Sequence, residues 1–125
     1  MILGNGVDLV EIQRIKEIIE RKPRFINRFF TKNEYKIFES KGFKTETIAG
    51  NFAAKEAVVK AMGTGVRGFD LVDIEVLRDE MGKPYVVLHG RAKAVALGMN
   101  VGEIHLSISH SQTQAVAFAI AMLKI

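Results

Sequence analysis

The chain has 125 residues, 48% of them hydrophobic and none of them cysteine, which suits one domain and excludes both a disulfide framework and a zinc–thiolate site. A formal net charge of +4 favours an acidic partner, such as nucleic acid, a phosphorylated ligand or an acidic protein, or serves solubility alone. Residues 1–10 lack the features of a secretory signal, and residues 112–123 are too short to span a membrane, so we expect a cytoplasmic protein.

The N-terminal third predicts one strand followed by helices. Residues 2–10 are mostly apolar and predict a short buried strand. Aromatic residues at irregular helical spacing predict one or two short helices in residues 24–42, where Thr31 and Glu34 fit a capping box. Between these segments, isoleucines at helical spacing predict an amphipathic helix that ends before Pro23, formed around Ile12, Ile15, Ile18 and Ile19.

The central part predicts a long helix and a hairpin. Residues 47–62 are rich in alanine and are followed by Gly63, a common residue at the end of a helix. Alternating apolar and acidic residues predict a half-buried strand over residues 71–78. A turn at residues 81–83 then leads to a second strand over residues 84–89.

The C-terminal part predicts a short helix and two strands. Residues 91–97 form the helix, which ends at Gly98, and residues 104–109 alternate as a strand. In residues 115–122 the alanines favour a helix by propensity, but they alternate strictly with larger residues. This period of two predicts a strand with alanines on one face. The expected fold is therefore α+β, an antiparallel sheet packed against helices.

Glu56 and Lys60 are the first candidate functional residues. They lie four apart on the predicted central helix and therefore project from one side. Glu56 falls at the edge of the apolar stripe, where a carboxylate can face a cleft, although an ordinary surface ion pair has the same spacing. Four alanines on this helix leave room for a bulky ligand: Ala53, Ala54, Ala57 and Ala61. Beyond the helix, Gly63, Thr64 and Gly65 can present backbone N–H groups to a phosphate.

Asp8 is the second candidate, because it interrupts the apolar run of the first strand. A buried carboxylate needs a partner, and a metal ion, an arginine or the start of the following helix would each serve. Asp8 and Glu56 together would supply two oxygen ligands, and Mg²⁺ characteristically takes only one or two protein carboxylates. The absence of cysteine argues against a soft metal.

Two further groups of residues stand out. Ser109 and His110 end the predicted strand of residues 104–109, where His110 contacts either a ligand or the backbone. Basic residues mixed with apolar ones form a possible docking site for an acidic amphipathic helix, with a solvated surface as the alternative. These docking candidates are Arg14, Ile18, Arg21, Arg24, Phe25 and Arg28.

Taken in order, these segments resemble the holo-[acyl-carrier-protein] synthases, the small 4′-phosphopantetheinyl transferases. The resemblance covers almost the whole chain, and its most specific part is the phrase Ala-Ala-Lys-Glu-Ala followed by Lys60 and Gly-Thr-Gly. The other matching stretches are GNGVDLVEI at residues 4–12, GKP at residues 82–84 and LSISH at residues 106–110.

The resemblance implies a reaction and a role for each candidate. Such enzymes use Mg²⁺ to move phosphopantetheine from coenzyme A to a serine of acyl carrier protein, in support of fatty acid biosynthesis. Asp8 and Glu56 would hold the metal, and Lys60 would bind the pyrophosphate. The nucleotide would contact Gly63, Thr64, Gly65, Lys83, Pro84, Ser109 and His110. The docking candidates would bind acyl carrier protein.

The resemblance also implies a homotrimer with active sites between subunits, where the alanine face of the last strand would suit close packing. Neither nucleic acid nor a membrane is expected as a partner. Family members often carry an arginine where this chain has Asn51, so a candidate phosphate contact is lost, and Lys41 or Lys44 would replace it. The turn before Lys83 has Met81 where asparagine is common.

Two other functions fit parts of the pattern. A magnesium nuclease would use Asp8, Glu56 and Lys60, but such sites usually place the acid and the lysine two apart on a strand. A basic nucleic-acid-binding module would need base-stacking aromatic residues among its basic ones. Most phenylalanines here occupy apolar helical positions instead.

Overall fold

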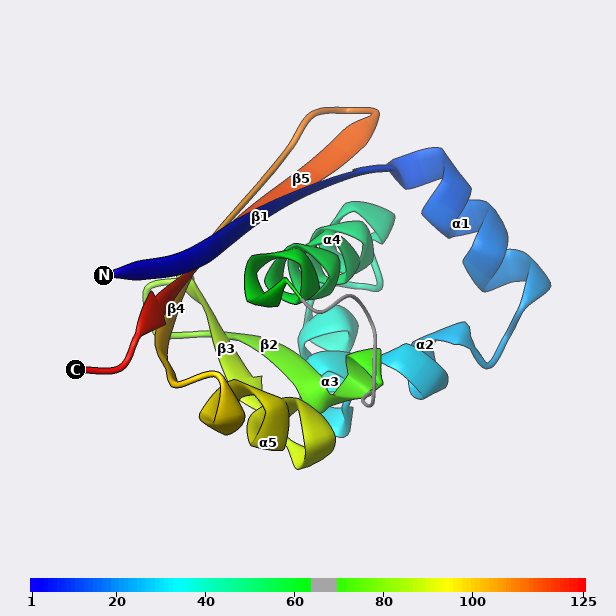
Figure 1. Cartoon of the computed structure of the whole chain (residues 1–125). Helices are drawn as coiled ribbons and strands as arrows, with labels where there is room; N and C mark the ends of the chain where they lie inside the picture. Colours follow the sequence, from blue (N-terminus) through cyan, green and yellow to red (C-terminus); the bar gives the residue numbers. More distant parts are fainter. Residues whose placement is uncertain (64–69) are drawn as a thin grey trace.

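A computed structural model describes residues 1–63 and 70–125 and confirms the predicted α+β class (Figure 1). The long helix α4 lies between a sheet on one side and a hairpin with a short helix on the other. In chain order the elements are β1 (Ile2–Glu11), α1 (Ile12–Arg21), α2 (Phe25–Phe29), α3 (Lys32–Ser40), α4 (Thr45–Met62), the 3₁₀ turn η1 (Leu71–Asp73), β2 (Ile74–Arg78), β3 (Pro84–Leu88), α5 (Gly90–Gly98), β4 (Val101–His110) and β5 (Gln114–Leu123).

The strands form two antiparallel sheets. The larger sheet has the order β1-β5-β4, and β2 pairs with β3 in the smaller one. Ala117 on β5 pairs with Asp8 on one side and Ile108 on the other, so the three residues share one face of the sheet. Because that face packs on α4, Asp8 points toward the central helix.

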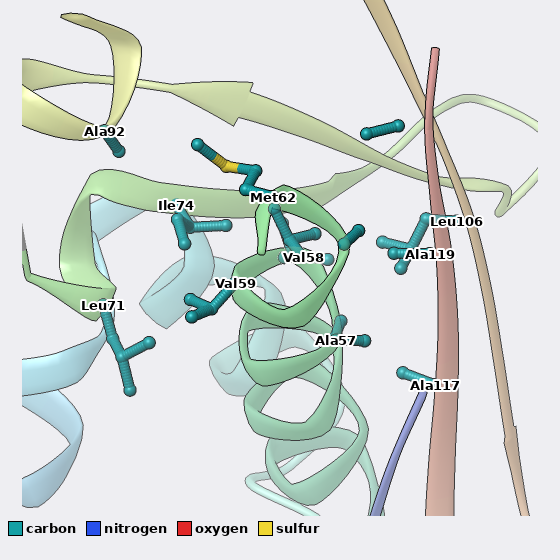
Figure 2. Close-up of a cluster of buried hydrophobic side chains, with 14 of the residues drawn as sticks. Ala57, Val58, Val59, Met62, Leu71, Ile74, Ala92, Leu106, Ala117 and Ala119 are labelled. Atoms are coloured by element: carbon teal, nitrogen blue, oxygen red, sulfur yellow. The ribbon is translucent and has the colours of Figure 1, made fainter. Parts of the chain in front are cut away.

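The alanines of β5 face α4, as Figure 2 shows for Ala117 and Ala119, which lie across from Ala57 of α4, with Leu106 of β4 beside Ala119. All four are at most 1% exposed: Ala115, Ala117, Ala119 and Ala121. The predicted strand is confirmed, but placing its alanine face at a contact between subunits was wrong. Small side chains are needed inside, where helix and sheet approach closely, and the larger residues of β5 therefore point outward.

Two glycines of β1 allow this close approach. A Cβ atom at Gly4 would lie 2.2 Å from the Ala61 carbonyl oxygen, and one at Gly6 would lie 2.2 Å from that of Ala57. Any larger side chain would push β1 away from α4. The glycines therefore set the distance between Asp8 on β1 and the functional side of the helix.

Residues 71–78 were expected to form one half-buried strand, but they form two elements. Residues Leu71–Asp73 form the turn η1, and only Ile74–Arg78 pair as β2. Ile74, Glu75 and Val76 are all buried, because both α4 and α3 pack against β2. Glu75 finds partners in the Thr31 hydroxyl and the His89 ring.

A buried ion pair joins α3 to α4. The Lys55 ammonium lies 2.7 Å from Glu34 Oε1, and both side chains are 0% exposed. Lys55 also donates to the carbonyl oxygens of Leu71 and Ile74, at 3.1 and 2.6 Å. Glu34 completes the predicted capping box with Thr31. The pair therefore ties α3, η1 and β2 to the middle of α4.

Within the described residues, no helix combines the length and apolar character needed to cross a bilayer.

Candidate functional site

The structure brings Asp8, Glu56 and Lys60 together, although β1 and α4 are distant in sequence. Asp8 and Glu56 line one cavity of about 500 Å³, which we call the first cavity. Lys60 Nζ donates to Asp8 Oδ1 at 3.1 Å and to the Val7 carbonyl oxygen at 3.0 Å. The side chains of Asp8 and Lys60 are 16% and 54% exposed, so the carboxylate is largely shielded and the ammonium reaches solvent.

Two alternative roles of these residues do not hold. Asp8 does not cap α1, because the N-cap residue is Glu11 and no side chain caps that end. Lys60 pairs with Asp8 across the helix–sheet contact, so the Glu56–Lys60 spacing does not mark a simple ion pair along the helix. The lysine instead links α4 to β1 beside both carboxylates.

The electrostatics of Glu56 set it apart from a surface carboxylate. Burial raises the pKa of Glu56, the negative charge of Asp8 raises it further, and Lys60 partly offsets both effects. Two carboxylates that repel each other in one cavity favour a cation between them. In the described residues, no group of three or more acidic, histidine or cysteine side chains forms a metal cage. The chain thus offers two oxygen donors, which suits Mg²⁺ completed by phosphate and water.

Part of the expected nucleotide-binding set gathers elsewhere. Lys41, Pro84 and His110 line a cavity of about 230 Å³ next to Gly50 and Arg78, which we call the second cavity. His110 Nδ1 donates to the Ser111 carbonyl oxygen at 3.2 Å, which leaves its other ring nitrogen available to a ligand. The first and second cavities share no lining residue.

The rest of the expected set is dispersed. Lys83 lines a different groove between β3 and β4, and Lys44 is the N-cap residue of α4. Ser109 pairs with Val116 and faces the outer side of the sheet, opposite to His110, because side chains alternate along β4. Gly63 ends α4 with a left-handed backbone (φ 73°). Thr64 and Gly65 lie outside the described residues.

The docking candidates that reach the surface, which we call the basic surface, adjoin the first cavity and comprise Arg14, Ile18, Arg21, Arg24 and Arg28. Arg14 and Ile18 line that cavity from α1. Three further arginines are exposed: Arg21 on α1, Arg24 just before α2, and Arg28 on α2. Phe25 is 7% exposed and packs against Phe29, Phe30 and Phe52, so the expectation of an exposed aromatic contact was wrong there.

Sequence reasoning missed the surroundings of Asn51. Asn51 is 0% exposed, and its Oδ1 accepts a hydrogen bond of 2.7 Å from Arg78. The position therefore faces a buried polar network and does not itself contact a ligand on the surface. One feature of the sequence could have indicated this network. Asn51 and Lys55 lie four positions apart on the buried side of α4, where polar side chains need partners.

Comparisons with known proteins give one consistent result. The model of the 4′-phosphopantetheinyl transferase superfamily matches residues 4–120. A holo-[acyl-carrier-protein] synthase of Clostridium botulinum (strain Alaska E43 / Type E3) is 56% identical over 120 residues, covering 96% of this chain and 97% of that protein. The crystal structure of the Neisseria meningitidis synthase aligns with a TM-score of 0.91 at 31% identity, over 98% of this chain and 99% of that one.

The Helicobacter pylori synthase, solved in complex with coenzyme A, aligns with a TM-score of 0.84 at 30% identity, over 94% of this chain and 99% of that one. Fold and sequence together therefore define a transferase enzyme. The chain belongs to the 4′-phosphopantetheinyl transferase superfamily, among its holo-[acyl-carrier-protein] synthases.

Proposed function

We propose that the chain uses Mg²⁺ to transfer the 4′-phosphopantetheine of coenzyme A to a serine of apo-acyl carrier protein. The observation that carries this proposal is the convergence of Asp8 and Glu56 in the first cavity, with Lys60 beside them. The coenzyme A bound to the Helicobacter pylori synthase supports the choice of co-substrate. We further propose that the reaction takes place in the cytoplasm and supports fatty acid biosynthesis.

Asp8 and Glu56 would hold the metal. Its charge would neutralise the pyrophosphate and polarise the phosphorus under attack. Lys60, whose ammonium reaches solvent, is placed to contact the same pyrophosphate and to stabilise the charge on the leaving group.

Glu56 is the candidate general base. The serine oxygen forms a bond to the β-phosphorus of coenzyme A, its proton passes to the Glu56 carboxylate directly or through a water, and the bond to adenosine 3′,5′-bisphosphate breaks. In the chain without metal, burial and the charge of Asp8 raise the pKa of Glu56 above that of an ordinary glutamate, which favours proton uptake.

The direct test combines the protein with apo-acyl carrier protein, coenzyme A and Mg²⁺ and follows the mass of the carrier. We expect the carrier to gain one phosphopantetheine group, and to gain none when Mg²⁺ is removed by a chelator. A carrier of unchanged mass in the complete mixture would refute the proposed function.

The basic surface is the proposed docking site for acyl carrier protein, with Phe25 left out. Arg14 and Ile18 line the first cavity, so a carrier bound to α1 would have its serine close to Asp8 and Glu56. Exposed arginines attract an acidic partner and mainly speed its association.

We expect Arg14→Ala with Arg21→Ala to raise KM for acyl carrier protein by about 10-fold, since each exposed charge pair contributes at most about 1 kcal/mol. The value of kcat should change little, and the defect should shrink as salt screens the charges. Steady-state kinetics at varied carrier concentration test this, with the exposed Arg91→Ala as the matched control. An unchanged KM would exclude this surface.

The outer face of the larger sheet is the proposed contact between three copies of the chain. Val7, Leu9 and Phe118 project there and are 53%, 58% and 42% exposed. Since Val7 pairs with Phe118, the three form one apolar patch. A trimer with sites between subunits would also explain why the first and second cavities are separate within one chain.

Phe118→Glu is expected to convert the trimer into monomers, because it places a charge in an apolar contact. Light scattering coupled to size exclusion would measure the mass. Leu97→Glu, at an exposed apolar residue of α5, is the matched control and should leave the trimer intact. A trimeric Phe118→Glu protein, or a monomeric parent, would contradict the proposed interface.

A further inference from the structure

The second cavity carries an excess of positive charge. Lys41 and Arg78 line it against a single acidic residue, Glu46, and the His110 ring adds a hydrogen-bonding group. The first turn of α4 also lines it, and the side chain of the N-cap residue Lys44 has no acceptor with which to cap the N–H groups of this helix end. The partial positive charge of the helix end therefore adds to that of the side chains. The volume of about 230 Å³ suits a phosphate group better than a whole nucleotide.

Arg78 is fixed in this cavity by neutral acceptors. Its guanidinium donates to Asn51 Oδ1 at 2.7 Å and to the Leu77 carbonyl oxygen at 3.3 Å. Asn51 is itself held, because its amide nitrogen donates to Glu34 Oε2 at 3.2 Å and to the Val76 carbonyl oxygen at 3.0 Å. The orientation of the guanidinium is thus set before any ligand arrives, and several of its N–H groups remain for one.

The charge of Arg78 lacks a direct counter-ion. Among the described residues, no carboxylate oxygen lies within 4.0 Å of its guanidinium, and Glu34 pairs with Lys55 instead. Burial lowers the pKa of Arg78, and the charge of Glu34 offsets this only in part. A guanidinium that is partly removed from water and not paired with an acid is well suited to bind an anion.

We propose that Arg78 binds the 3′-phosphate of coenzyme A. This inference rests on the proposed function, in which the pyrophosphate lies at Asp8, Glu56 and Lys60. The second cavity shares no residue with that site, and the 3′-phosphate is the one phosphate of coenzyme A that remains. Arg78, held by Asn51, would be a binding residue that distinguishes coenzyme A from its 3′-dephospho form.

The test compares coenzyme A with 3′-dephospho-coenzyme A as substrates of the parent and of Arg78→Met. We expect the substitution to raise KM for coenzyme A by about 10- to 100-fold, the loss of a hydrogen bond to a charged group. KM for the dephospho substrate should change less than about 3-fold, and kcat should change little with either substrate. Arg91→Met, which removes an exposed guanidinium from α5, should behave as the parent does.

A second variant and a second measurement keep the proposal testable if Arg78→Met disturbs the fold. Arg78→Lys keeps the charge and loses the planar fork, so it should raise KM for coenzyme A to an intermediate extent. Adenosine 3′,5′-bisphosphate should stabilise the parent against heat more than AMP does, and this difference should shrink in both variants.

The outcomes distinguish a failure of the inference about the 3′-phosphate from a failure of the proposed function. If the parent transfers phosphopantetheine but an Arg78 variant raises KM equally for both substrates, the inference about the 3′-phosphate is wrong and the proposed function stands. If the parent transfers nothing from coenzyme A, the proposed function itself fails.

Discussion

Glu56→Gln is expected to reduce phosphopantetheine transfer by more than about 100-fold. Loss of a residue that only orients a metal ligand costs up to about 100-fold, and the proposed role of Glu56 is to contact the metal directly. The amide keeps the size of the side chain but loses the charge that, in the proposed mechanism, binds Mg²⁺ and accepts a proton. Transfer measured over a range of Mg²⁺ concentrations tests this, because higher Mg²⁺ should restore little activity. The exposed Glu80→Gln is the matched control.

The same variant should be more stable than the parent without metal. Because the folded state raises the pKa of Glu56, this group stabilises the fold below its unfolded pKa, and that contribution is lost as pH rises through the raised value. Glutamine never acquires the charge, so Glu56→Gln should melt at a higher temperature than the parent at pH 8, with a smaller difference at pH 4. Mg²⁺ with coenzyme A should stabilise only the parent. An active variant, or one that melts lower at pH 8, would contradict the assignment.

If Glu56 holds Mg²⁺ as proposed, protons compete with the metal for this carboxylate in the parent. At low Mg²⁺ the acid limb of the pH–rate profile should therefore lie above the range of an ordinary glutamate, and raising Mg²⁺ should shift it to lower pH. A limb that does not respond to Mg²⁺ would show that a different group titrates.

The elements and the two carboxylates were predictable because each has a local signal. The period of two in β5 outweighed the helix propensity of alanine, and an acid inside an apolar strand identified Asp8. The orientation of β5 was not predictable in this way. Alternation shows that two faces differ, but which face is buried depends on how closely α4 approaches, and the contacts of Gly4 and Gly6 with α4 set that distance.

Side-chain networks that join several elements could not be predicted from the sequence either. Ser109 and His110 are neighbours in sequence and were assigned to one ligand, but strand alternation sends them to opposite faces. At Asn51 the sequence predicts only the loss of a phosphate contact. In the structure Asn51 orients Arg78, a residue of β2 that lies 27 positions further along the chain. Such a pairing depends on the packing of β2 on α4, for which no local pattern exists.

Lys55→Met is expected to destabilise the protein by about 3–5 kcal/mol, the usual cost of removing one partner from a buried ion pair. The change leaves Glu34 as an uncompensated charge at 0% exposure and removes the donor to the Leu71 and Ile74 carbonyl oxygens. Denaturant unfolding measures the loss, and for a chain of this size the melting temperature should fall by about 10–20 °C. The exposed Lys36→Met should change stability by less than about 0.5 kcal/mol.

The pH dependence of the variant identifies the cause of its instability. Burial raises the pKa of Glu34 in the parent, and Lys55 opposes that rise. Without Lys55 the pKa rises further, so the variant should recover stability as pH falls and Glu34 takes up a proton. Adding Glu34→Gln should likewise restore part of the loss at pH 8, because the amide still accepts hydrogen bonds but carries no charge. If neither low pH nor Glu34→Gln restores stability, the unpaired carboxylate is not the source of the defect, and lost packing around Lys55, including its contact with the Phe30 ring, must account for it.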